Sequence, residues 1–239
     1  MACPESARMV LQHAAAAGRL DVLELAVAHG AQLASEAGSW AALSAAVSGQ
    51  LDAMRYAMER GADVRVEGGR AALTAAKAGH WRASELLVAA GGDLEPDGVG
   101  AQLLALAAVS GQLDLVKALE EKGVLVASPA GTAALSAMGS TREWEACHEA
   151  VRYLVEQRAD VRSEAGGRAL LSAAMYGDLE MVRFLAERGV ELRSEVGGEA
   201  VARAGELGPA DSTAPVAAFL SGHGAVAPPP QKLVIDEDF

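Results

Sequence analysis

The sequence contains one place where catalytic chemistry could arise, at Cys147 and His148. A histidine beside a cysteine could take up the thiol proton and leave a reactive thiolate, as thiol enzymes and redox switches require. Successive residues of an α-helix, however, point about 100° apart and pair poorly. We therefore favour a lengthened turn whose Trp144 packs on a neighbouring part of the fold. A partner contact by Trp144 is a second possibility, because tryptophan is enriched at binding hot spots.

Other catalytic or metal-binding patterns do not occur in the sequence. It has no Walker loop, no G-x-S-x-G and no H-E-x-x-H pair. The two cysteines, Cys3 and Cys147, are far apart and form neither a zinc pattern nor a disulfide framework. We therefore expect no catalytic residue, no cofactor, no metal and no small-molecule substrate. A thiol enzyme or redox switch at Cys147 and His148 stays the less favoured alternative.

Charged residues recur in a pattern that suits protein recognition. We place a row of acidic residues at the tips of successive loops, with basic residues between them. The acidic row is Glu36, Glu67, Asp97, Glu164 and Glu195, and the basic residues are Arg65, Arg70, Arg162, Arg168 and Arg193. Alternating charge mostly sets orientation and association rate, whereas anchors such as Trp40 or Tyr176 would supply affinity. For any single residue of the row, simple solvation of a loop is the alternative.

A repeat positions these residues. GQLDAMRYAMERGADV at 49–64 returns as GDLEMVRFLAERGVEL at 177–192, and the interval of 128 residues is four steps of 32. Related copies begin at Gly18, Gly79 and Gly111, each with a second glycine 12 positions later. A fixed period of this length is typical of a solenoid of stacked repeats.

Each repeat predicts two helices. In the copy at 168–192, the helix-forming segment 169–176 ends at Gly177, a residue that favours helix termination. Apolar residues then return at helical spacing, which predicts a second, amphipathic helix, and 193–198 (RSEVGG) is expected to be a loop. Paired alanines recur in each first segment, for example Ala45 and Ala46, and let neighbouring first helices approach closely. Larger residues on the second helices then curve the stack and create a concave surface.

The repeat resembles an ankyrin repeat, with a short helix, A-A-x-x-G, a longer helix, G-A-D-V and a β-turn finger. The clearest stretches are GHWRASELLVAAGGDL at 79–94 and MERGADVRVEGG at 58–69. The resemblance covers roughly residues 9–226, although the usual T-P-L-H opening is missing and the period is about 31 instead of 33. It implies an all-α fold, an α-solenoid of about seven stacked helix-turn-helix repeats.

We divide the chain into a lead-in (1–8), the solenoid (9–226) and a tail (227–239). The fifth and seventh repeats are stretched, and the seventh is polar and proline-rich, as suits a terminal cap. The expected repeats are 9–39, 40–69, 70–101, 102–131, 132–167, 168–198 and 199–226.

The tail combines an extended spacer with a segment that could bind. Three prolines at 228–230 favour a polyproline II spacer, and an apolar run with three acidic residues follows them. Such a segment could add a strand to a partner's sheet edge or dock in a groove. A solubilising, disordered terminus is the alternative.

Composition restricts the class of function. The net charge of −12 argues against a binder of nucleic-acid phosphates, and no apolar stretch reaches the length of a membrane span. The first residues lack the pattern of a secretory signal. We expect an intracellular protein, cytoplasmic by default, with the nucleus or an organelle left open.

The resemblance implies a protein partner that is bound through the fingers and the exposed positions of the first helices. We expect a non-catalytic scaffold or accessory subunit of a larger assembly. An acidic decoy, which occupies a basic protein surface in place of nucleic acid, is the main alternative. The expected partner-binding residues are Trp40, Glu67, Arg70, Lys77, Trp144, Glu164, Arg168, Tyr176, Glu195, Leu233, Val234, Ile235 and Phe239.

Overall fold

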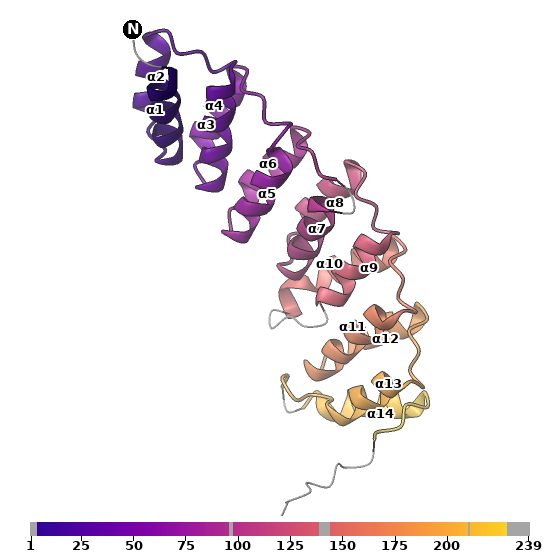
Figure 1. Ribbon diagram of the computed structural model, residues 1–239. Helices are drawn as coiled ribbons and strands as arrows, with labels where there is room; N and C mark the ends of the chain where they lie inside the picture. Colours follow the sequence, from indigo (N-terminus) through magenta and orange to yellow (C-terminus); the bar gives the residue numbers. More distant parts are fainter. Residues whose placement is uncertain (1–3, 96–97, 139–143, 210, 229–239) are drawn as a thin grey trace, which may run out of the picture. The chain divides into compact units, whose positions relative to one another are not determined.

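The computed structural model describes residues 4–95, 98–138, 144–209 and 211–228. Within these residues the regular elements are fourteen α-helices, which follow one another in pairs (Figure 1). The all-α prediction and the prediction of stacked helix pairs are therefore confirmed. The first helix begins at Pro4, inside the segment 1–8 that we expected to be a lead-in.

The chain divides into two compact units. Unit 1 comprises 1–137 and 145–159, and unit 2 comprises 138–144 and 160–239. The helices of unit 1 are α1 (Pro4–Ala16), α2 (Leu20–Ala28), α3 (Glu36–Val47), α4 (Leu51–Glu59), α5 (Gly68–Lys77), α6 (Trp81–Ala89), α7 (Val99–Val109), α8 (Leu113–Glu121), α9 (Pro129–Met138) and α10 (Trp144–Glu156). The last residue of α9, Met138, and the first residue of α10, Trp144, belong to unit 2. Unit 2 holds α11 (Glu164–Met175), α12 (Leu179–Glu187), α13 (Glu195–Ala202) and α14 (Thr213–Gly222).

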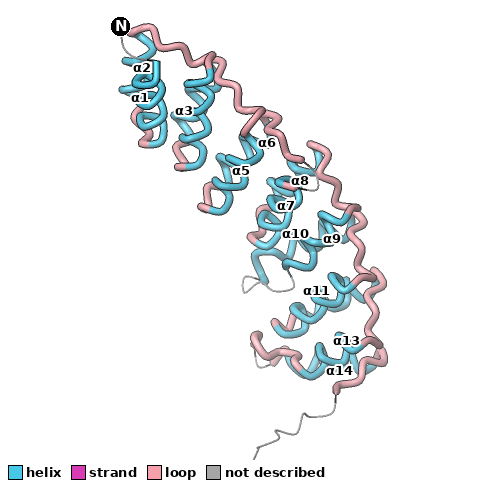
Figure 2. The backbone as a smooth tube through the Cα atoms, viewed as in Figure 1, coloured by secondary structure: helices cyan, strands magenta, loops and turns pink. Residues whose placement is uncertain are grey.

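Equivalent helices stack on one another within each unit. In unit 1 the first helices α1, α3, α5 and α7 contact in series, and so do the second helices α2, α4, α6 and α8. In unit 2, α11 contacts α13 and α12 contacts α14. The loops after α2, α4 and α6 lie on one side of unit 1, and the turns within the pairs lie on the opposite side (Figure 2). We call a loop that joins two successive repeats a finger.

Residue size explains this stacking. The paired alanines of the first helices, such as Ala45, Ala46 and Ala75, have no exposed surface. Their small side chains let backbones approach closely, while second helices bury larger side chains such as Leu23 and Met54. The alanine pairs are buried as predicted, but the division by size is incomplete, because large side chains such as Leu103 and Leu170 are also buried on first helices.

The glycines that we predicted as helix stops have the left-handed backbone that ends a helix. Gly177 has a φ of 73° and Gly189 a φ of 96°. In the fifth repeat Arg158 occupies the second glycine position with a φ of 69°. A side chain is disfavoured there because its Cβ crowds the following carbonyl oxygen.

The first helices begin earlier than the sequence analysis predicted. The segment 193–198, expected as a loop, already contains the start of α13, because the Ser194 hydroxyl accepts a hydrogen bond of 3.2 Å from the Gly197 backbone N–H. Ser35 caps α3 in the same way at 3.3 Å from the Gly38 nitrogen. A serine N-cap followed by an acidic residue is a strong helix start. Glu36, Glu164 and Glu195 therefore lie in first helical turns and not at finger tips.

A third set of glycines makes these early helix starts possible. A Cβ atom added to Gly197 would lie 2.0 Å from the backbone oxygen of Leu192, and one added to Gly38 would lie 2.0 Å from that of Leu33. The first turn of the helix thus packs directly on the backbone of the preceding finger. Only glycine leaves room for that approach.

Candidate functional site

A groove lies between α3 and α5 on the first-helix side of unit 1. It has a volume of about 520 Å³, and its lining includes Trp40, Leu43 and Val47 from α3 and Arg70 and Ala71 from α5. The floor is apolar, since Leu43 is 6 % exposed and Ala71 is 8 % exposed. The groove therefore combines an apolar floor with charged and aromatic walls, as partner-binding surfaces commonly do.

Three of the expected partner-binding residues meet in this groove. Trp40 is 37 % exposed, and its indole N–H donates to a Glu36 carboxylate oxygen at 3.3 Å. On the opposite wall a guanidinium nitrogen of Arg70 lies 3.6 Å from the carboxylate of Glu67. The Arg70 side chain keeps most of its surface exposed, so it can turn toward a ligand.

Lys77 extends the same face of α5. Arg70, Thr74 and Lys77 follow one another at a spacing that places them on one side of a helix, and all three are exposed. Arg70 and Thr74 line the groove. This face of α5 therefore extends from the groove to the end of the helix, where Lys77 adds a second positive charge.

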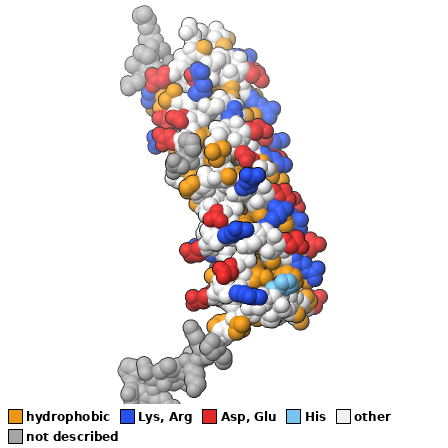
Figure 3. Space-filling model, turned by 90° about the vertical axis from the view of Figure 1, so that its right-hand side faces the viewer, with side chains coloured by type: hydrophobic (Ala, Val, Ile, Leu, Met, Phe, Trp, Pro, Cys, Tyr) orange, Lys and Arg blue, Asp and Glu red, His pale blue; other side chains and the backbone are white. Residues whose placement is uncertain are grey.

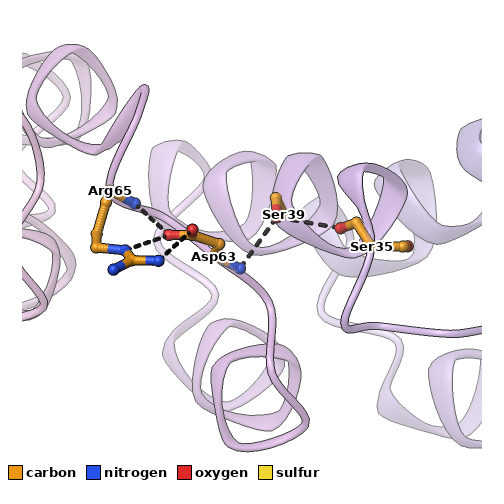
Figure 4. Close-up of polar contacts among 4 residues, drawn as sticks. All are labelled: Ser35, Ser39, Asp63 and Arg65. Carbon is orange, nitrogen blue, oxygen red and sulfur yellow. Dashed lines mark hydrogen bonds and ion pairs between the residues drawn. The ribbon is translucent and has the colours of Figure 1, made fainter.

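The adjacent finger is attached to α3 by a network that the sequence analysis missed (Figure 4). The Ser39 hydroxyl accepts a hydrogen bond of 3.0 Å from the Asp63 backbone N–H and donates to the Ser35 carbonyl at 3.1 Å. The Asp63 carboxylate accepts from the Arg65 guanidinium at 2.9 and 2.7 Å. That guanidinium lowers the pKa of the Asp63 carboxyl to about 2. These bonds hold the finger beside the groove, and Glu67 follows directly after it.

A short sequence signal could have revealed this network. A-D-V-R occurs at 62–65 and again at 159–162. In the second copy the Arg162 backbone N–H donates to the Asp160 carboxylate at 3.0 Å, as the Arg65 N–H does to Asp63 at 3.0 Å. An aspartate that binds the backbone two residues later is a recognised turn-forming arrangement.

Unit 2 holds a second set of expected residues. Glu164 and Arg168 form an ion pair of 2.7 Å on one exposed face of α11. Glu195 is exposed in the first turn of α13. Tyr176, at the end of α11, is half-buried. Whether these residues bind a partner stays a prediction.

Trp144 does not belong to the surface. It is 2 % exposed, and its ring stacks on Tyr176 with centroids 6.3 Å apart and planes 7° apart. Its indole N–H donates to one carboxylate oxygen of Asp178 at 2.9 Å. The other oxygen of Asp178 accepts from the Met181 backbone N–H at 2.9 Å and so caps α12. The expected partner contact by Trp144 is wrong, because packing on the neighbouring repeat, the interpretation we favoured, buries the side chain.

The surroundings of Trp144 are also helical. The second helix of the stretched fifth repeat, α10, has 13 residues, whereas α12, the second helix of the sixth repeat, has 9. The stretching of the fifth repeat therefore includes a longer second helix. The expectation that Trp144 lies in a lengthened turn is corrected accordingly. Cys147, one turn further along α10, has no exposed surface. A thiol without access to solvent is poorly placed to act as a nucleophile or a redox sensor.

Four of the expected binding residues lie outside the described part of the chain: Leu233, Val234, Ile235 and Phe239. Asp97, from the expected acidic row, lies outside it as well. None of the helices in the described ranges is long and apolar enough to cross a membrane. Nor do the described residues include a group of three or more His, Cys, Asp or Glu side chains that could hold a metal ion.

Comparison with known families gives one match. Residues 133–186 match the family model described as ankyrin repeats (many copies). The matched stretch includes all of α10 and α11, together with most of α9 and α12. No curated protein sequence matches the chain.

Proposed function

The chain carries ankyrin repeats, and from that premise we propose that it is a non-catalytic protein-binding scaffold or an accessory subunit of a larger assembly. Ankyrin repeats suggest a protein-binding repeat protein, and the family is typically non-catalytic. The proposed binding site is the groove between α3 and α5, with Trp40, Glu67, Arg70 and Lys77 as its contact residues.

The exposure of Trp40 carries this proposal. An aromatic ring that is 37 % exposed at the wall of an apolar groove offers a large contact area at a small cost in side-chain entropy. Glu36 restrains the ring through its hydrogen bond, so the anchor is partly ordered before a partner arrives. The charged residues of the wall formed by α5 and the residue before it, Arg70 and Glu67, would then set the orientation of the bound segment.

The pairing of charges favours a scaffold over an acidic decoy. In unit 1 the carboxylates of Asp63 and Glu85 each lie 2.7 Å from an arginine on the same element, Arg65 and Arg82 respectively. On the face that Figure 3 shows, acidic and basic side chains are interleaved and do not gather into one acidic patch. The net charge of −12 still favours encounters with basic partners through its long-range field.

Affinity capture with matched variants tests the proposal. The full chain, Trp40→Ala, Arg70→Glu and Arg82→Glu would be used as baits in an extract of the native source, with captured proteins identified by mass spectrometry. Arg82 is a matched control, because it is an exposed arginine that pairs with a glutamate three residues away, as Arg70 does. We expect a partner that the full chain and Arg82→Glu retain and that both groove variants lose.

Retention by both groove variants would show that the groove is not the site. Repeating the capture at low and moderate salt separates the two functions. A decoy held by its net charge loses its partner between these salt concentrations, because exposed charges are then screened. A partner anchored on Trp40 is retained at both concentrations.

A further inference from the structure

The groove between α3 and α5 has a definite order of charge along its length. Both helices begin beside the finger that Ser39 holds, so Glu36 and Glu67 lie together at one end. Arg70, one turn into α5, lies 3.6 Å from Glu67 and offsets one of these two negative charges, so one negative charge remains at this end. Trp40, Leu43 and Val47 make the central part apolar. Lys77 marks the other end, as the last residue of α5. A complementary segment would have a positive charge, then apolar residues, then negative charges.

One segment of this chain has that order. Lys232 is followed by Leu233, Val234 and Ile235, and then by three acidic residues at 236–238. The segment lies outside the described residues. Along the groove from Glu67 to Lys77, the charge at each end is opposite in sign to the charge at the corresponding end of the segment.

The lengths agree as well. From Glu67 to Lys77 the helix advances by about 15 Å, at about 1.5 Å per residue. An extended segment from Lys232 to Asp236 spans about 13 Å, and one that reaches Glu237 spans about 17 Å, at about 3.3 Å per residue. Lys232 can therefore pair with Glu67 while the first carboxylates reach Lys77.

We propose that the segment Lys232–Phe239 of a second copy of this chain docks in the groove between α3 and α5. Lys232 lies at the end marked by Glu36 and Glu67, the apolar run covers Trp40, and the acidic residues lie at Lys77. The prolines at 228–230 favour an extended spacer between α14 and the segment. This contact is heterologous, since two different surfaces meet.

This inference rests on the proposed function, because it uses the same groove. It adds a regulatory consequence, since self-association at high concentration occupies the site that a different partner would need. Binding of such a partner would therefore weaken as the concentration of the chain itself rises.

Sedimentation equilibrium of the full chain, in 0.15 M salt, tests the proposal. We expect the average mass to rise above the monomer value of 24.4 kDa with concentration. Trp40→Ala in the groove and Ile235→Asp in the segment should each lower the association constant by about thirtyfold or more, as loss of a hot-spot contact does. Arg55→Glu, an exposed charge reversal on α4, serves as the control and should associate like the unaltered chain.

Mixing the two defective variants gives the sharper result. Trp40→Ala still offers its segment, and Ile235→Asp still offers its groove, so an equimolar mixture should form a 1:1 complex of twice the monomer mass although neither variant associates alone. Non-specific apolar association would not be restored by mixing. A chain that stays monomeric at all concentrations, or a mixture that stays monomeric, would overturn the proposal.

A labelled peptide with the sequence of residues 231–239 tests the direction of binding. Its fluorescence anisotropy should rise on addition of the Ile235→Asp chain, whose groove is free. Lys77→Glu in that chain should weaken binding by about tenfold, as should Lys232→Glu in the peptide. Combining Glu67→Lys with the Lys232→Glu peptide should restore binding.

Equal affinity for a scrambled peptide would contradict the proposed order of charge. If the peptide fails to bind while a captured partner still depends on Trp40 and Arg70, the segment is not the occupant, and the proposed function stands. If neither the peptide nor any partner depends on these residues, both proposals fail.

Discussion

The hydrogen bond between Trp144 and Asp178 should couple the first residue of α10 to the cap of α12. Asp178 uses one carboxylate oxygen for the Trp144 indole N–H and the other for the Met181 backbone N–H, both at 2.9 Å. Removing either side chain should therefore destabilise the fold, and removing both should cost less than the sum of the two single losses.

The magnitudes follow from these contacts. Trp144→Phe keeps most of the buried ring and loses a hydrogen bond to a charged acceptor, a loss of about 1.5–3 kcal/mol in unfolding free energy. Asp178→Ala loses the same bond together with the helix cap, and the cap contributes about 1 kcal/mol. The double variant loses the bond only once, so the coupling energy should be about 1.5–3 kcal/mol. Asp178→Asn should keep the cap, because asparagine caps helices as well as aspartate.

Urea denaturation followed by far-ultraviolet circular dichroism would measure these differences. Hydrogen exchange of the α12 amides would show whether the loss is local, which matters because a repeat protein can unfold in parts. Trp81→Phe is the matched control, since Trp81 is also the first residue of a second helix. It should show no coupling to Asp178→Ala. Additive costs for Trp144→Phe and Asp178→Ala, within about 0.5 kcal/mol, would refute the bond.

Three further predictions concern stability. Gly197→Ala should lower the unfolding free energy by about 1–3 kcal/mol in a urea melt, because its Cβ would overlap the finger backbone. Gly222→Ala should be neutral or stabilising, since no neighbouring atom of the described residues lies within 4 Å of the added Cβ. Equal effects of the two substitutions would contradict the close approach at Gly197. Burial and the hydrogen bond to Glu120 raise the pKa of Tyr153 to about 12, so between pH 10 and 12 the unfolded chain releases a proton that the folded chain keeps. Stability should fall as pH rises through that window, and the melting temperature of Tyr153→Phe, measured across the same range, should fall less; parallel curves would show that Tyr153 does not contribute. Ser84 is fully buried and its hydroxyl has no hydrogen-bond partner among the described residues, so Ser84→Ala should leave the melting temperature unchanged or raise it. A large decrease would show that the hydroxyl forms a stabilising hydrogen bond.

The helix starts show where sequence reasoning stopped short. The period, the glycine stops and the alanine pairs are local or repeated features, so they were readable from the sequence and agree with the structure. The earlier starts of α3 and α13 depended on recognising serine as an N-cap inside a segment that looked like a loop. That signal was present as Ser-Glu at 35–36 and 194–195, whereas the Ser163 hydroxyl before α11 donates to the Asp160 carbonyl. The serine marks a helix start here because a glycine three residues later lets the first helical turn pack on the finger.

Trp144 and Trp40 show that the sequence pattern does not predict which side chains are buried. The two are the same type of residue, yet Trp144 is 2 % exposed and Trp40 is 37 % exposed. Burial depends on which helix faces come together, and the residues next to a side chain in the sequence do not determine that packing. Asp178 and Tyr176, more than 30 residues away from Trp144, decide its environment.

The sequence alone determined that this chain is a stack of helix pairs, because a repeated amphipathic pattern can bury its apolar faces only against copies of itself. It also determined the places where helices end, since a left-handed residue strongly favours glycine. Tertiary structure alone decided which of the expected contact residues share a surface. Trp40, Glu67 and Arg70 meet because α3 and α5 pack side by side. Trp144 leaves the surface because it packs against Tyr176 and Asp178, in the turn between α11 and α12.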